Sequence, residues 1–82
     1  PRAATLWLER GLFEASRGDA ASARGSFETG AANAPDYPPL FEALARLEFG
    51  EGNEARAEEV ARAGGVVPPA VGAAAAGREV TF

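Results

Sequence analysis

The sequence predicts an all-α protein, an α-solenoid of antiparallel helix pairs that ends in an irregular C-terminal tail. Two observations lead to this fold class. The chain matches itself when it is shifted by about 34 residues, a distance called the period below. This is the length of one helix–turn–helix unit in a helical array. In addition, apolar residues recur at helical spacing, and no strand-like alternation of apolar and polar residues occurs before residue 65.

The self-match divides the chain into units, because aromatic, small, turn and proline positions repeat in step. The positions that define the repeat are Trp7, Gly18, Ala23, Phe27 and Pro35 in the first unit, and Phe41, Gly52, Ala57 and Pro69 in the second. Residues 1–35 are therefore the first predicted helical repeat and residues 36–69 the second. Residues 70–82 are expected to be a degenerate cap or a disordered tail.

The first unit is expected to hold two helices, over residues 3–17 and 20–33. Gly18 can adopt the left-handed conformation that ends a helix, and the Asp19 carboxylate can cap the free N–H groups of the next helix. One apolar stripe runs along the second helix, formed by Ala20, Ala23, Phe27, Ala31 and Ala34. A polar helix with a single apolar stripe buries that stripe against its neighbours.

The second unit is predicted to repeat this plan. Pro35 ends the preceding helix, while Pro38 and Pro39 fit the first turn of a helix that runs to about residue 49, because a missing N–H leaves no bond unmade there. Gly52 ends that helix, and Asn53 is expected to cap a last helix that reaches about residue 64.

Beyond residue 65 the helical pattern weakens. Residues 66–69 are expected to be extended, and the Ala-Gly run that follows has little to bury. Ala75 stands at the register position of Trp7 and Phe41, so a third unit would lack its aromatic anchor. Residues 79–82 are expected to be extended or disordered.

Composition limits the classes of function. Eight Arg and no Lys stand against twelve acidic residues, a net charge of −4, so the segment lacks the basic stripe of a self-sufficient nucleic-acid binder. His and Cys are absent, and the serines have no partner to activate them, so we expect no enzyme activity, cofactor or metal site. No apolar run is long enough for a membrane span, and we expect an intracellular protein without a small-molecule substrate. The lack of Met suggests that the native start lies outside this segment.

Two local patterns have both a functional and a structural interpretation. Gly50 to Ala55 fit the loose dinucleotide pattern G-x-G-x-x-A, but they follow a predicted helix instead of a strand. Glu14 and Glu48 recur at the same helix end, where pairing with an arginine of the unit's second helix is favoured over acid–base chemistry. Arg24 is the candidate for such pairing in the first unit.

A set of paired residues in the first unit, together with its proline, carries a family resemblance: Leu6-Trp7, Phe13-Glu14, Gly18-Asp19, Ala23-Arg24, Phe27-Glu28 and Pro35. They resemble the half-a-TPR (HAT) repeat, a tetratricopeptide-like unit with an aromatic residue in its first helix and Ala-Arg in its second. The second unit has Glu58 and Ala61 in place of Arg24 and Phe27, which is closer to a generic tetratricopeptide unit. The resemblance extends from the start of the chain to about Pro69. It implies a non-catalytic role in RNA metabolism, in pre-mRNA splicing, 3′-end cleavage or organellar transcript maturation.

Two functions remain open for such a chain, and they differ in the partner. The acidic net charge and the concave surface of stacked helix pairs favour a scaffold for protein partners. Direct binding of single-stranded RNA by a longer array is the alternative; its contacts would come from basic residues, and the candidate partner-binding surface consists of Arg10, Arg24 and Arg56. Trp7, Phe27 and Phe41 could stack on bases, but their register favours the core.

Overall fold

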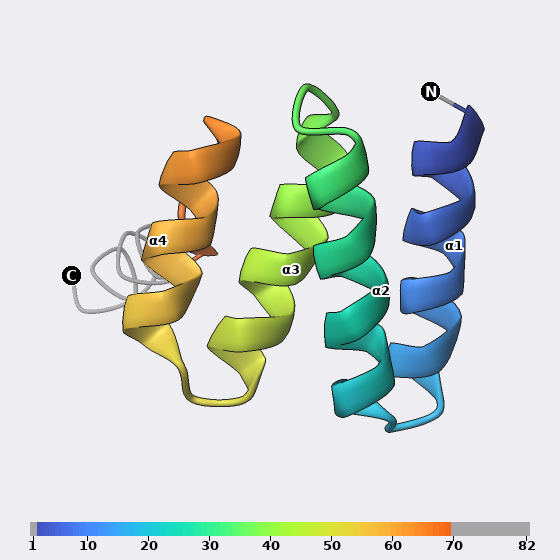
Figure 1. Ribbon diagram of the computed structural model, residues 1–82. Helices are drawn as coiled ribbons and strands as arrows, with labels where there is room; N and C mark the ends of the chain where they lie inside the picture. The colour runs from blue at the N-terminus through green and yellow to red at the C-terminus, as the bar shows by residue number, and fades with distance from the viewer. Residues whose placement is uncertain (1, 70–82) are drawn as a thin grey trace, which may run out of the picture.

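Four helices make up the described part of the chain. The structure, a computed structural model, describes residues 2–69. Its helices are α1 (Arg2–Ser16), α2 (Ala20–Asn33), α3 (Pro38–Gly50) and α4 (Glu54–Gly64), and each runs antiparallel to the one before it (Figure 1). Residues 2–69 contain no strand, so the predicted all-α class is confirmed for them. The expectations for residues 70–82 lie outside the described residues.

The turn between α1 and α2 forms as its residue types predict. Gly18 has a φ of 79°, a left-handed conformation that a side chain would strain. The backbone N–H of Asp19 then donates to the Glu14 carbonyl at 3.0 Å. The Asp19 carboxylate accepts the Ser22 N–H at 3.1 Å, which confirms the predicted helix cap. Hydrogen bonds from the side chain and backbone of Ser22 stabilise the charged carboxylate and so lower the pKa of Asp19.

The turn between α3 and α4 repeats this backbone plan one period later. Gly52 has a φ of 85°, and the Asn53 N–H donates to the Glu48 carbonyl at 2.8 Å. Asn53 occupies the predicted N-cap position of α4, but its side chain makes no capping hydrogen bond to that helix. Its Nδ2 donates to Glu48 Oε1 at 2.9 Å. An amide has N–H groups to donate, which the carboxylate of Asp19 lacks, and the buried Glu48 carboxylate accepts one of them.

Small residues let the helices approach closely around two large side chains. Phe27 of α2 and Leu40 of α3 are fully buried. The alanines that reach zero exposure are Ala23, Ala45, Ala57 and Ala61. Trp7 and Phe41 are partly buried and pack against the same core, on the packing faces that their register predicts.

In each helix pair, a glycine of the second helix packs against the aromatic residue of the first helix. A Cβ added to Gly30 would lie 2.7 Å from Trp7 Cβ, and one added to Gly64 would lie closer still to Phe41 Cβ. Trp7 and Phe41 are one period apart in the sequence, as are Gly30 and Gly64. The α1–α2 and α3–α4 pairs therefore share one packing contact as well as one turn.

The helices form a row in which α1 also reaches α3. α1 packs against α2, α2 against α3 and α3 against α4, and a further contact joins α1 to α3. Pro35 lies exposed in the turn after α2, and Pro38 and Pro39 occupy the first turn of α3 as predicted. Because α1 and α3 touch, they form one continuous surface on the same side of the molecule.

Candidate functional site

A mostly apolar groove lies between α1 and α3 and is the candidate site. It has a volume of about 370 Å³. Its walls are Leu8, Leu12 and Ala15 from α1 and Pro39, Ala43 and Leu47 from α3, with Phe27 of α2 and the charged residues Glu42 and Arg46 completing the lining. Leu12 is 52% exposed, although leucine usually gains by burial. The groove thus offers apolar surface to a partner, with one charge of each sign beside it.

The sequence contained a signal for this groove that the repeat match did not use. Leu8, Leu12 and Ala15 are spaced i, i+4, i+7, so they share one side of α1. One period later Glu42 and Arg46 replace the two leucines. The stripe therefore belongs to α1 alone, and a search for positions common to both units passes over it.

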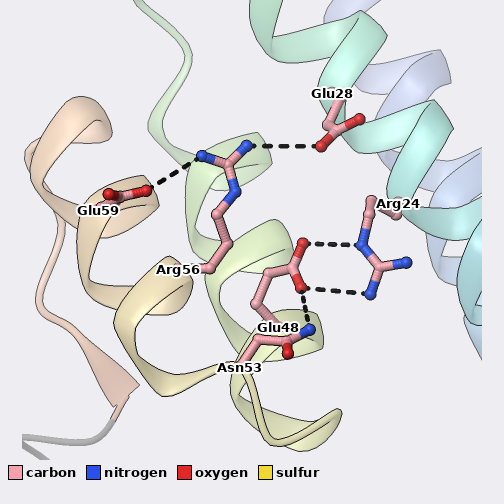
Figure 2. A network of polar contacts seen from close by, with 6 residues as sticks. All are labelled: Arg24, Glu28, Glu48, Asn53, Arg56 and Glu59. Atoms are coloured by element: carbon pink, nitrogen blue, oxygen red, sulfur yellow. Dashed lines mark hydrogen bonds and ion pairs between the residues drawn. The ribbon is translucent and has the colours of Figure 1, made fainter.

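Arg24, one of the three predicted surface residues, makes the shortest ion pair in the described part of the chain. Its Nε donates to Glu48 Oε2 at 2.8 Å and its Nη2 donates to Glu48 Oε1 at 3.2 Å, so the contact is bidentate (Figure 2). The Glu48 side chain is only 3% exposed and that of Arg24 is 30% exposed. This pair joins α2 to α3 and corrects the expected partner of Arg24, which was Glu14.

Glu14 is held by other groups. The Ser26 hydroxyl donates to Glu14 Oε1 at 2.5 Å, and Arg10 Nε donates to Glu14 Oε2 at 3.4 Å. The long Arg24 side chain instead reaches forward to the next helix pair. A sequence comparison within one unit could not show this contact, because the two partners belong to different units.

The pKa values of the Arg24–Glu48 pair follow from this geometry. The hydrogen bond from Arg24 holds the pKa of Glu48 below its usual range, with the Asn53 amide acting in the same direction against the effect of burial. The same bond raises the pKa of Arg24. Both groups are charged at neutral pH, and Arg24 is committed to a contact within the fold.

The other two arginines of the predicted surface are also paired, but they lie apart from each other. Arg56 of α4 is 3.5 Å from both Glu28 and Glu59 and stands near the Arg24–Glu48 pair (Figure 2). Arg10 lies on α1, where its guanidinium sits 5.6 Å from the centre of the Trp7 ring. The structure therefore places Arg24 and Arg56 in neighbouring ion pairs and leaves Arg10 apart from them.

Among residues 2–69 no group of three or more acidic, His or Cys side chains is placed to hold a metal ion. The Gly50 to Ala55 segment comprises the last residue of α3, the turn that follows and the start of α4. Within this described range, no helix combines the length and apolar character that crossing a bilayer requires.

Comparison with family models, with curated proteins and with solved structures finds no match to this chain.

Proposed function

We propose that this chain is a non-enzymatic helical-repeat scaffold that binds a protein partner in the groove between α1 and α3. The observation that carries the proposal is the exposed apolar lining of that groove, where Leu12 remains 52% exposed. Concave apolar sites with a few polar groups at the edge are typical binding sites. The partner segment that fits has apolar side chains for the groove and a charged group near Glu42 or Arg46.

The repeat architecture is part of this proposal. It is supported by the shared turn geometry at Gly18 and Gly52 and by the contact of Trp7 with Gly30, which recurs as Phe41 with Gly64. Stacked helix pairs of this kind bind partners on a continuous surface built from several units. The resemblance to half-a-TPR repeats adds the setting, an RNA-processing or transcript-maturation complex.

The groove is tested by peptide binding with two matched leucine variants. Peptides selected from a displayed library on the wild-type chain are expected to lose at least about tenfold in affinity for Leu12→Glu, because a charge then occupies the apolar wall. Leu6→Glu is the control, since Leu6 lies on the same helix and is 60% exposed but does not line the groove. Its affinity for the same peptides is expected to change less than about twofold, as for residues outside an interface.

Fluorescence anisotropy measures the two affinities, and circular dichroism shows that both variants keep the helical content of the wild type. Equal binding to all three proteins would contradict the proposal. So would a loss confined to Leu6→Glu.

Direct RNA binding by this segment is expected to be weak. The carboxylates of the fold already pair with Arg10, Arg24, Arg56 and Arg62, and the net charge is −4. Few phosphates can therefore be neutralised, and affinity for single strands depends on that number. We expect a labelled single-stranded oligonucleotide to bind no tighter than nonspecific contact allows, about 10⁻⁴ to 10⁻⁶ M near physiological salt.

Anisotropy across a salt series measures this affinity. A dissociation constant below about 1 μM with a steep salt slope would exceed the nonspecific range. It would replace the protein-scaffold proposal with direct RNA recognition.

A further inference from the structure

The outer face of α1 is defined here as Leu6, Arg10, Phe13 and Glu14. Its first three residues are exposed and the Glu14 side chain is 17% exposed, whereas the matching face of α3 is covered. Leu6 and Phe13 are each 60% exposed. One period later, Leu40 is completely buried and Leu47 is partly buried. The same register positions are therefore filled with apolar side chains in both helices, but within residues 2–69 only α3 has a helix packed on them.

The contacts of α3 show what covers such a face. Gly30 of α2 lies so close to Leu40 that an added Cβ would be 2.9 Å from Leu40 Cδ2. Arg24 of α2 makes the bidentate bond to Glu48 of α3. On α1, Leu6 and Glu14 stand in the places of Leu40 and Glu48. α1 thus carries an apolar residue and a carboxylate at the same spacing as the two α3 residues that contact α2.

We propose that the outer face of α1 binds the second helix of another helix pair in the same polypeptide, and that an arginine at the place of Arg24 on that helix bonds Glu14. The inference rests on the repeat architecture proposed above and not on the groove between α1 and α3. The partner helix presents a small residue to Leu6 and its arginine to Glu14. It packs on α1 in the way that α2 packs on α3.

Charge complementarity supports this partner. Arg10 stands one period before Leu44, which lines a pocket with Glu28 and Ala31 of α2. An acidic residue at the place of Glu28 on the incoming helix would therefore lie across from Arg10. The present Arg10–Glu14 pair spans 3.4 Å, and Arg10 is 64% exposed. Because its arginine is so open to solvent, this pair contributes little to stability, and exchanging it for two cross-helix pairs costs little while Ser26 keeps its bond to Glu14 Oε1.

Two observations favour the same polypeptide over a second copy of the chain. In another copy the helix that matches α2 in register is α4, which carries Glu58 at the place of Arg24 and would set a carboxylate against Glu14. In addition, Pro1 lies one period before Pro35. Pro35 belongs to the short connection between the end of α2 and the start of α3. A helix that ends at such a proline would be joined to α1 by the short connection that joins α2 to α3.

The test places a copy of residues 1–34 in front of residue 1 of the full chain, as the probe helix pair. Arg24 of the added copy then precedes Glu14 by 24 residues, the separation found between Arg24 and Glu48. We expect hydrogen exchange of the α1 amides to slow in this fusion. We also expect Leu6→Asp to lower the melting midpoint by about 10 °C in the fusion and by less than about 2 °C in the 82-residue chain, because Leu6 is buried only in the fusion.

Two controls locate the contact. Arg24→Met in the added copy and Glu14→Gln in the original chain should each lower the midpoint of the fusion, and together they should lower it by less than the sum of the two. Unchanged exchange of the α1 amides, whether the added pair folds elsewhere or not at all, overturns the proposal. Equal sensitivity to Leu6→Asp with and without the added pair also overturns it. Peptide binding in the groove, tested with Leu12→Glu, is unaffected by either result.

Discussion

Replacing Gly30 with alanine is expected to destabilise the protein by about 2 kcal/mol. The new methyl group would lie 2.7 Å from Trp7 Cβ and 2.9 Å from Leu40 Cδ2, so it meets α1 and α3 at once. Trp7 Cβ is fixed to the α1 backbone and cannot rotate away, which means that the helices must separate. Overpacking of this severity costs up to about 3 kcal/mol, and the better helix propensity of alanine returns only about 1 kcal/mol.

Gly25→Ala is the matched control, because Gly25 lies on the same helix with open space around the position of a new Cβ. Only the propensity gain applies there, so stability should rise by about 0.5–1 kcal/mol. Urea unfolding followed by circular dichroism measures both variants. The expected changes have opposite signs; a stabilising effect of Gly30→Ala would show that α1 and α2 are not packed as closely as described.

Arg24→Met is expected to cost about 3 kcal/mol, because it leaves the Glu48 carboxylate buried with only the Asn53 amide as a side-chain partner. This is the lower end of the range for breaking a buried pair, as the Arg24 side chain is 30% exposed. Removing both charges with Arg24→Met and Glu48→Leu should recover much of the loss, since apolar replacements of a whole buried pair are often neutral. Denaturant unfolding of the two variants gives the comparison.

Arg62→Met is the control for losing an arginine as such. Arg62 lies 3.7 Å from Glu58, and its side chain is 76% exposed. An exposed pair contributes little, so the change in unfolding free energy should stay below about 0.5 kcal/mol. If Arg24→Met were as mild as Arg62→Met, the Arg24–Glu48 pair would not be stabilising the contact between α2 and α3.

The same pair gives the fold a dependence on acid. Because the folded-state pKa of Glu48 is lowered from its usual 4.5, its contribution is fully present above that value and is lost as the pH falls through the folded pKa. The deficit of Arg24→Met relative to wild type should therefore shrink in acid, where protonation also relieves the stranded carboxylate of the variant. A deficit that stays constant from pH 7 to about pH 3 would exclude Glu48 as its source.

Helix positions could be predicted from the sequence because they depend on local chemistry. Gly18 with Asp19, and Pro35 with Pro38, act within one turn, and the observed ends of α1 to α4 lie within a residue or two of the expected ones. Asn53 is the exception. Its cap position was predictable, but its hydrogen bond depends on the buried Glu48 carboxylate, which only the packed fold brings within reach.

The candidate site was less predictable, because it is formed between units. Arg24 bonds Glu48 across 24 residues, and Leu12 and Ala43 line one groove only after α1 and α3 come together. A match between positions one period apart identifies what the two units share. The groove, by contrast, depends on leucines that only the first unit has.

Glu48 also has a consequence for how the chain unfolds. Its carboxylate is bonded by Arg24 of α2 and by Asn53 at the start of α4, while its backbone belongs to α3. Separating α2 from α3 removes the Arg24 bond, and unfolding the start of α4 removes the Asn53 bond, so this carboxylate couples the stability of three helices. Arrays whose units interact only through small interfaces can fray one unit at a time. Here we expect the Glu48 contacts to make α2, α3 and α4 unfold together, and we expect protonation of this carboxylate to weaken that coupling.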